Sequence, residues 1–356
     1  MGQEATTQIA KATEFTIPVS PAFDLLAVSP SQITRPSNIR EFKVDWSFRS
    51  WRLKPNIAIQ AQPIWELAYN RPDLGKYRRA SKLMKTLSTL DLSAGTIEDA
   101  DQSRRASLAA KLNLFRQHDP LEEVGLFAKM DSVYRKRQDA TLVNMAMVRL
   151  KRDAATDKQA LARYDNSLDS LQGIYDREAS MQKERIQTVA QQYILDHWNA
   201  AHLDIACGKL YAYENAALDS LNLRAAGSAV WVNGSLPVGK RLMLNGTVRF
   251  MKQVAQDSFS TRINTTSGGI GMRYGSPKFT FFVEFVFSKF KSDTSFSFEE
   301  MPELNMAQLN NFSTSYGGDW RINRNVLLSY GVRLDHSDGY KVKNIIPVAG
   351  VSCMMR

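Results

Sequence analysis

Cysteine and histidine are both scarce in this sequence. Its 356 residues include two cysteines, Cys207 and Cys353, and four histidines. Two isolated thiols form neither a disulfide framework nor the closely spaced ligand set of a metal site, although a single bridge between them stays open. The small residues Gly268-Gly269-Ile270-Gly271 fall inside a strand pattern and do not form a phosphate-binding loop. We therefore predict no metal and no cofactor.

Long hydrophobic runs are absent. No segment approaches the roughly 20 apolar residues that a membrane-spanning helix needs, which excludes a helical membrane protein. The hydrophobic content of 44% and the mean hydropathy of −0.32 would suit a soluble protein. Neither value tests for a transmembrane β-barrel, because only every second residue of a barrel strand faces lipid.

A basic cluster is also lacking, despite a formal net charge of +10. The longest basic runs, Lys76-Tyr77-Arg78-Arg79 and Tyr134-Arg135-Lys136-Arg137, are short. They come with no zinc-ligand set and no recognisable nucleic-acid motif. A solvated or phosphate-facing surface explains the charge better, and we predict no nucleic-acid partner.

The first residues do not read as a signal peptide. Met1-Gly2-Gln3-Glu4-Ala5 has neither a basic start nor an apolar segment, which taken literally favours the cytoplasm. We expect instead that the signal peptide has been removed and that the sequence begins near a mature N-terminus. Residues 1–40 are rich in Pro and Ser, which predicts an extended irregular segment. We expect it to be periplasmic or to fold into the protein as a plug.

Residues 41–117 and 203–356 carry a pattern of period two. Near 279–288, for example, Phe281 and Phe285 alternate with Thr280 and Glu284. Such alternation predicts strands with one apolar and one polar face. About twelve strands are predicted, four in the first range and eight in the second, near 41–52, 56–69, 84–97, 104–117, 203–213, 220–233, 240–252, 260–274, 278–290, 310–321, 325–335 and 344–354.

A one-sided sheet in a soluble protein would alternate in the same way. Three features favour a membrane instead. The strands run to about 10 residues, which is long for a soluble sheet. Their polar faces carry full charges. Aromatic residues sit at many strand ends, as at a lipid–water interface, namely Trp51, Trp65, Tyr69, Tyr211, Tyr213, Trp231, Tyr274 and Trp320. The sequence therefore predicts an all-β, antiparallel transmembrane barrel in contact with outer-membrane lipid.

A helical period interrupts the barrel pattern in 118–202. Helices are predicted over about 121–150 and 161–200, with a turn and helix N-cap at Ala155-Thr156-Asp157. In the second helix, apolar residues at intervals of three and four form a heptad-like stripe of Tyr164, Leu168, Leu171, Tyr175, Ile186, Val189 and Tyr193. The favoured interpretation is an antiparallel hairpin whose two arms bury each other. The alternative is an arm that docks a periplasmic protein or a second copy of the chain.

The lengths of the connections assign sides to the barrel. Those at 237–239, 275–277 and 323–325 are short, whereas those at 292–307 and 336–340 are longer and polar. Bacterial barrels have short periplasmic turns and longer outer loops, and their N-terminus starts in the periplasm. The helical hairpin is the fourth connection, on the same side as the short turns, so we predict that it is periplasmic.

The polar faces of the strands are predicted to line the lumen. These residues are Lys43, Asp45, Arg49, Glu66, Asp91, Lys111, Asp204, Arg224, Arg249, Arg273, Glu284, Asp319, Arg321 and Arg333. A selective pore would normally line its constriction with charges of one sign. Because the two signs nearly balance here, we predict paired networks across a narrow lumen.

A catalytic site is not indicated. Only His336 falls in a predicted outer loop, within Asp335-His336-Ser337-Asp338-Gly339. Nucleophilic catalysis needs a hydroxyl, a base and an acid in contact, usually brought from different strands. This string is ordinary turn chemistry, so we predict no catalytic residue, and a hydrolase at the barrel rim ranks third among the functions.

The N-terminal segment resembles a known group of proteins. Pro18-Val19-Ser20-Pro21-Ala22-Phe23-Asp24-Leu25-Leu26, with Arg35-Pro36 and then Val44-Asp45-Trp46-Ser47, is similar to uncharacterised outer-membrane β-barrel proteins of Bacteroidota-type bacteria. The resemblance implies the fold and the compartment and carries over no functional residue. The first functional hypothesis is a non-enzymatic barrel that anchors or scaffolds a periplasmic assembly through its hairpin. The second is a narrow, plugged channel for small polar solutes.

Overall fold

The computed structural model describes residues 19–33, 42–49, 56–69, 74–98, 104–119, 122–213, 223–254, 262–292, 308–323, 325–336 and 342–354. The chain divides into two compact units. One unit contains the helical insertion, 118–196, and the other contains the barrel, 15–117 with 197–356.

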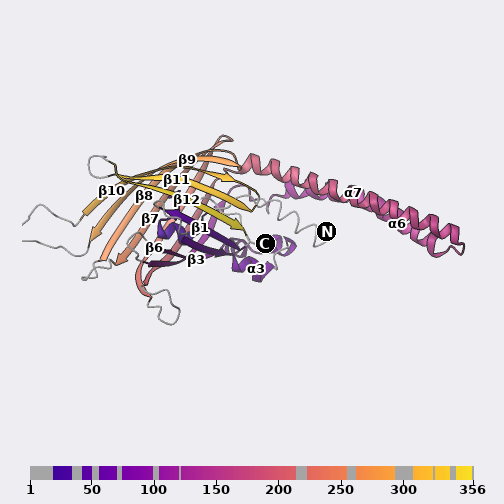
Figure 1. Ribbon diagram of the computed structural model, residues 1–356, viewed down its shortest axis with the longest axis horizontal. Coiled ribbons are helices and arrows are strands. Elements are labelled where there is room, and N and C mark those ends of the chain that lie inside the picture. Colours follow the sequence, from indigo (N-terminus) through magenta and orange to yellow (C-terminus); the bar gives the residue numbers. More distant parts are fainter. Residues whose placement is uncertain are drawn as a thin grey trace, which may run out of the picture. The chain divides into compact units, whose positions relative to one another are not determined.

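The barrel unit is a closed antiparallel sheet of twelve strands (Figure 1). The strands are β1 Lys43–Arg49, β2 Asn56–Ala61, β3 Asp91–Glu98, β4 Arg104–Arg116, β5 His202–Tyr213, β6 Arg224–Val238, β7 Leu242–Val254, β8 Arg262–Gly275, β9 Phe279–Ser292, β10 Gln308–Arg321, β11 Val326–His336 and β12 Val342–Met354. Each strand pairs with its neighbours in sequence, and β1 pairs with β12 to close the ring. The predicted fold class is confirmed.

The barrel is apolar outside and polar inside. On β9, Phe285 and Phe287 are 42% and 51% exposed, whereas the side chain of Glu284 between them is buried. On β7, Leu244 and Val248 point outward while Asn245 and Thr247 point inward. This polarity is the reverse of that in a soluble barrel, and an outer surface of this kind requires lipid. The chain is therefore an outer-membrane β-barrel.

Two strands are shorter than predicted, because helices form in the segment between them. The strand predicted at 56–69 ends at Ala61, and helix α3 Pro63–Tyr69 follows. Proline is favoured at the first helical position, because a backbone N–H there would have no partner within the helix and the fixed φ of proline is helical. The strand predicted at 84–97 begins at Asp91, after helices α4 Leu74–Arg79 and α5 Lys82–Leu87. Ser81 caps α5 by accepting a hydrogen bond from the backbone N of Met84 at 3.3 Å.

Three aromatic residues that were predicted to lie at the lipid–water interface are buried instead. Trp65 and Tyr69, both on α3, pack with Tyr77 at ring distances of 5.2–5.5 Å. The prediction that Trp65 and Tyr69 belong to a lipid-facing girdle is therefore wrong, and burial raises the pKa of the Tyr69 phenol. Trp231 on β6 is also wrongly placed in the girdle, since it is 1% exposed and points into the barrel. Tyr274 and Trp320 do point outward.

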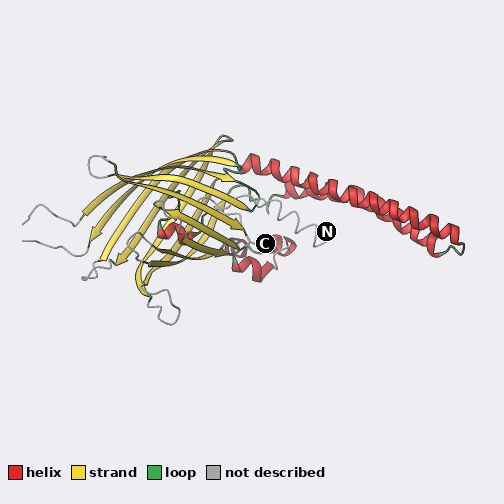
Figure 2. Ribbon diagram, viewed as in Figure 1, coloured by secondary structure: helices red, strands yellow, loops and turns green. Residues whose placement is uncertain are grey.

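The helical insertion is a pair of long antiparallel helices, α6 Val124–Asp153 and α7 Lys158–His197 (Figure 2). Asp157 caps α7 as predicted, accepting from the backbone N of Ala160 at 3.2 Å. The helices are joined by an ion pair of Arg152 with Asp165 at 2.6 Å and by a hydrogen bond from Thr141 to Glu178 at 3.0 Å. Of all described helices, none is both long and apolar enough to cross a membrane.

The two ends of the barrel differ in their connections. Residues 239–241, 276–278 and 322–325 are the short connections at one end, here called the turn end. Residues 50–55, 99–103, 214–223, 255–261, 293–307 and 337–341 are the connections at the other, the loop end. Trp198 and Asn199, which follow α7, bond to the β6–β7 turn at the turn end, through the carbonyls of Lys240 at 3.0 Å and Gly239 at 2.9 Å.

A short helix lies inside the barrel, where an extended irregular segment was expected. Helix α2 Pro21–Leu26 begins at Ser20, which accepts from the backbone N of Phe23, and ends at Ala27 with a left-handed φ of 57°. Ser20 followed by Pro21 is a favoured helix start. Residues 19–33, here called the plug, are buried or half-buried throughout.

Candidate functional site

The plug and the barrel wall around it form the candidate site. At the N-terminus of α2, the carboxylate of Asp45 on β1 accepts from the backbone N of Ser20 at 2.8 Å. Ser93 accepts from the backbone N of Ala22 at 2.9 Å, and Ser107 donates to the Ala22 carbonyl at 3.0 Å. A carboxylate at a helix N-terminus is favourable, and these contacts satisfy backbone groups that the short helix leaves free.

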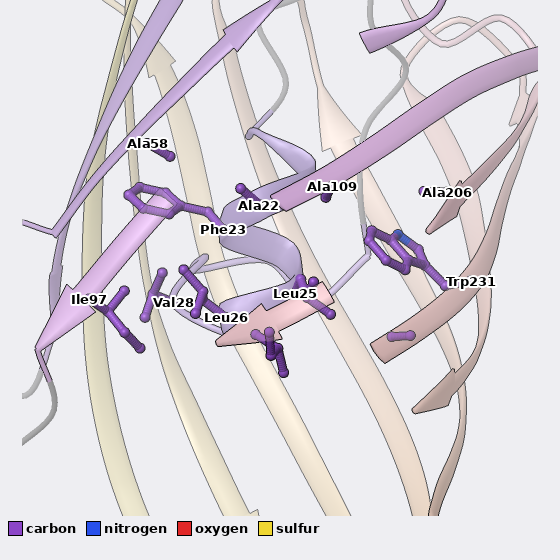
Figure 3. Close-up of a cluster of buried hydrophobic side chains, with 12 residues drawn as sticks. Ala22, Phe23, Leu25, Leu26, Val28, Ala58, Ile97, Ala109, Ala206 and Trp231 are labelled. Carbon is purple, nitrogen blue, oxygen red and sulfur yellow. The ribbon is translucent and has the colours of Figure 1, made fainter. Parts of the chain in front are cut away.

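The apolar face of α2 packs against small wall residues (Figure 3). Phe23, Leu25 and Leu26 are at most 2% exposed. The wall leaves room for them through alanines and two glycines. A Cβ at Gly95 would lie 3.2 Å from the Cβ of Ala22, and one at Gly208 would lie 2.7 Å from Leu25 Cδ2. The wall and the plug are therefore complementary in shape.

The second half of the plug is fixed by charged residues. Arg333 donates to the carbonyls of Ala27 at 3.3 Å and Ser29 at 3.1 Å, and Arg249 donates to that of Asp24 at 3.1 Å. Cations at helix C-terminal carbonyls are favourable. Glu284 accepts from the backbone N of Gln32 at 2.6 Å and from Ser31 Oγ. Gln32 also donates to Ser315 at 2.7 Å.

Buried charges in the lumen are paired. Lys43 Nζ lies 2.9 Å from Asp45, and Lys111 Nζ lies 3.2 Å from Asp91. Arg273 pairs with Asp319, which also accepts from Thr280 at 3.1 Å and Ser329 at 2.6 Å. Pairing of this kind offsets the large cost of removing an ion from water. The interior therefore holds ion pairs of both signs rather than a pathway lined with one sign of charge.

The predicted lumen residues fall into four groups. Buried in the barrel are Lys43, Asp45, Asp91, Lys111, Asp204, Arg273, Glu284, Asp319 and Arg333. Arg49, Arg249 and Arg321 are half-buried. Arg224 is exposed at the end of β6, paired in register with the buried Ala212. Glu66 belongs to helix α3, so the strand on which it was predicted ends before it, and its side chain lies outside the described residues.

A cavity of about 260 Å³ lies between the plug and the loop end of the barrel. From the plug it is lined by Asp24, Ala27, Ser29, Ser31 and Gln32, and from the wall by the loop-end halves of β7 to β11. Arg249, Arg333 and Asp335 contribute charges, and Thr247, Thr265, Ser267, Ser288 and Ser313 contribute hydroxyls. A cavity with this lining can hold a small polar molecule or water.

Two histidines contact hydroxyl groups. His336 Nε2 lies 3.2 Å from Thr314 Oγ1, while Ser337 and Asp338 of its predicted turn lie outside the described residues. His202 Nδ1 contacts Ser235 Oγ, and its Nε2 lies 3.7 Å from Asp204. These are the residue types of a hydrolytic triad. Both His202 and Ser235 are buried at the turn end of the barrel and neither lines the 260 Å³ cavity, so that cavity gives a substrate no access to them.

The described residues contain neither a group of side chains that could bind a metal ion nor a disulfide bond. No group of three or more His, Cys, Asp and Glu side chains there could hold a metal ion. Cys207 on β5 is exposed and Cys353 on β12 is half-buried, and both are free thiols.

The predicted docking stripe of the hairpin faces its partner helix in part. Tyr164, Leu168, Leu171, Tyr175, Val189 and Tyr193 are half-buried, and the side chain of Ile186 lies outside the described residues. On α6, Met145 and Leu126 are 6% and 5% exposed. Tyr193 donates to the carbonyl of His118 at 3.0 Å. These contacts stabilise the hairpin itself.

The chain matches no protein-family model and no curated protein sequence. Among solved structures it is similar to the NanC porin, with 8% identity over 88% of this chain and 100% of that chain, at a TM-score of 0.35. It is also similar to the β domain of the Bordetella autotransporter BrkA, with 7% identity, 88% and 98% coverage and a TM-score of 0.33. The translocator domain of the autotransporter NalP from Neisseria meningitidis gives 9% identity, 88% coverage of each chain and a TM-score of 0.31. Identities and TM-scores this low support no conclusion about function. The assignment to outer-membrane barrels rests on the closed sheet and on its apolar outer and polar inner face.

Proposed function

We propose that this chain is a non-enzymatic outer-membrane barrel, closed by its own N-terminal segment, that anchors or scaffolds a periplasmic assembly through its helical hairpin. The observation that carries the proposal is the plug. Its backbone is bonded to β1, β3, β4, β7, β9 and β11, and its apolar side chains fill the space between them. A lumen filled in this way supports an anchoring role better than free diffusion of solutes.

The hairpin supports the scaffold role through a second apolar face. Val143, Met147 and Leu150 on α6 are 56%, 50% and 71% exposed. Their spacing of four and three places them on one face of the helix, away from the buried Met145. Exposed apolar side chains gathered on one helix face are suited to a protein partner or a second copy of the hairpin.

The proposal also includes the orientation of the barrel, its targeting and its relatives. The turn end faces the periplasm, because short connections and the N-terminus of such barrels lie there, and the hairpin shares that end. The mature protein reaches the outer membrane after removal of a signal peptide. Its relatives are the outer-membrane barrels of Bacteroidota-type bacteria that the N-terminal segment resembles.

Co-purification from solubilised membranes tests the scaffold. Deleting residues 124–196 leaves Trp198 and Asn199 bound to the β6–β7 turn and should leave the barrel folded, as shown by heat-modifiable migration. The deletion should abolish capture of a periplasmic partner. A triple change of Val143, Met147 and Leu150 to Ser should weaken capture, and Met181→Ser, at a residue 51% exposed on α7, is the matched control. Retention of every partner after the deletion would exclude the hairpin as the docking element.

A gated channel for small polar solutes is the second candidate, favoured by the 260 Å³ polar cavity behind the plug. Conductance in a planar bilayer separates the two functions. The full chain should be silent as an anchor, and a variant lacking residues 1–33 should conduct. Steady openings of the full chain would place the channel first.

A further inference from the structure

The cavity between the plug and the loop end has buried polar atoms without a partner. Of its lining residues, Ser29 Oγ, Thr247 Oγ1, Thr265 Oγ1 and Arg333 Nε make no hydrogen bond. Their side chains are 3–8% exposed. Leaving a buried polar atom unsatisfied costs about 1–3 kcal/mol, so these four atoms give a polar ligand in the cavity groups to bind.

The lining is balanced in charge. Arg249 and Arg333 face Asp24 and Asp335, which gives no excess of either sign. Both guanidinium groups already donate to carbonyl oxygens of the plug. A solute with a net charge would therefore meet a like charge as well as an opposite one when it loses its hydration, and a neutral solute is favoured.

The unpartnered groups are mainly hydroxyls, which can both donate and accept. Hydroxyl-rich solutes offer the same two roles at each oxygen and can satisfy them pairwise. The cavity wall also has an apolar side, from Met251, Val286 and Phe290. A ring that carries hydroxyls at its edge and C–H bonds on its face presents both kinds of surface.

Size sets the scale of the ligand. The cavity of about 260 Å³ would hold roughly nine water molecules at about 30 Å³ each. That volume suits one pyranose ring. We propose that the cavity is a binding site for a neutral, monosaccharide-sized carbohydrate, held against the loop-end face of the plug.

Ligand-observed saturation-transfer NMR on the full chain in detergent micelles tests this site. The probes are glucose, galactose and mannose, with glucuronate as an anionic control and glycine as a zwitterionic control. At least one neutral hexose should receive saturation, and the two controls should not. Absence of transfer to every hexose at high millimolar concentration means that the cavity holds water only and overturns the proposal. Preferential transfer to glucuronate or glycine overturns it as well, because charge would then be the recognised feature.

Three conservative variants locate the binding. Thr247→Val and Thr265→Val keep the shape of the wall and remove one hydroxyl each, and Ser29→Ala does the same from the plug. Each should weaken hexose binding about fivefold, the effect of one lost hydrogen bond. Thr96→Val is the matched control, since Thr96 points outward on β3 and should not change binding. Heat-modifiable migration checks that each variant folds.

Binding that none of the three variants affects would place the sugar elsewhere and overturn the site. The result is independent of the anchoring proposal. Hexose binding does not require a hairpin partner, and loss of that partner after deletion of 124–196 does not require hexose binding.

Discussion

At the scale of single residues, the barrel interior depends on buried ion pairs. Lys111 and Asp91 are 2% and 0% exposed and lie 3.2 Å apart. Lys111→Met should destabilise the barrel by about 3–5 kcal/mol, because it leaves a buried carboxylate without its cation. Urea titration followed by tryptophan fluorescence measures the loss. The double variant Lys111→Met with Asp91→Leu should recover most of the stability, and a double variant as unstable as the single would show that the pair itself is not the cause.

Gly95 controls the fit of the plug. Its missing side chain leaves room for Ala22 and Leu26, which a Cβ would approach to 3.2 and 3.5 Å. Gly95→Leu should therefore displace α2 and raise the bilayer conductance severalfold over the full chain. Gly268→Leu is the control, because a Cβ at Gly268 meets nothing within 4 Å. Equal conductance of the two variants would mean that the plug tolerates the added side chain.

Residue-level predictions from sequence succeeded where they depended on alternation. The inward direction of Asp45, Lys111 and Glu284 follows from the period-two pattern alone, since neighbouring strand residues face opposite sides. Their hydrogen-bond partners in the plug could not be predicted from this pattern. Glu284 bonds to Gln32 over 252 positions and Arg333 to Ala27 over 306, and no local signal reports such pairs. Trp231 was misplaced because a lumen filled by a plug offers an aromatic residue an apolar site that an empty lumen does not.

At the scale of elements, the hairpin depends on burial between α6 and α7. Met145 is 6% exposed and Met147, two positions away on α6, is 50% exposed. Met145→Glu should destabilise the hairpin by several kcal/mol, because a carboxylate would be buried between the helices. Hydrogen exchange of amides in 141–153 should rise sharply. Met147→Glu is the matched control, and comparable exchange in both variants would show that this face of α6 is not buried.

Long elements were better predicted than short ones. The strands of the second range and both long helices repeat their pattern over many residues, which gives a strong signal. Helices α2, α3 and α5 have six or seven residues, too few to show a period of 3.6. Their signals are single residues, such as Ser20 and Ser81 at helix starts, and a helix this short persists only because tertiary contacts hold it.

At the scale of the whole molecule, twelve strands fix the side of every connection. Because each strand reverses direction, the helical insertion between β4 and β5 shares the turn end with connections 239–241, 276–278 and 322–325. The connection 293–307 between β9 and β10 belongs to the loop end. If the turn end is periplasmic, protease added to intact cells should cut within 293–307 and leave the hairpin whole. Cleavage at the helix connection 154–157 should appear only after the outer membrane is permeabilised. The opposite order would invert the barrel in the membrane, place the hairpin outside the cell and redirect the search for its partner to the cell surface.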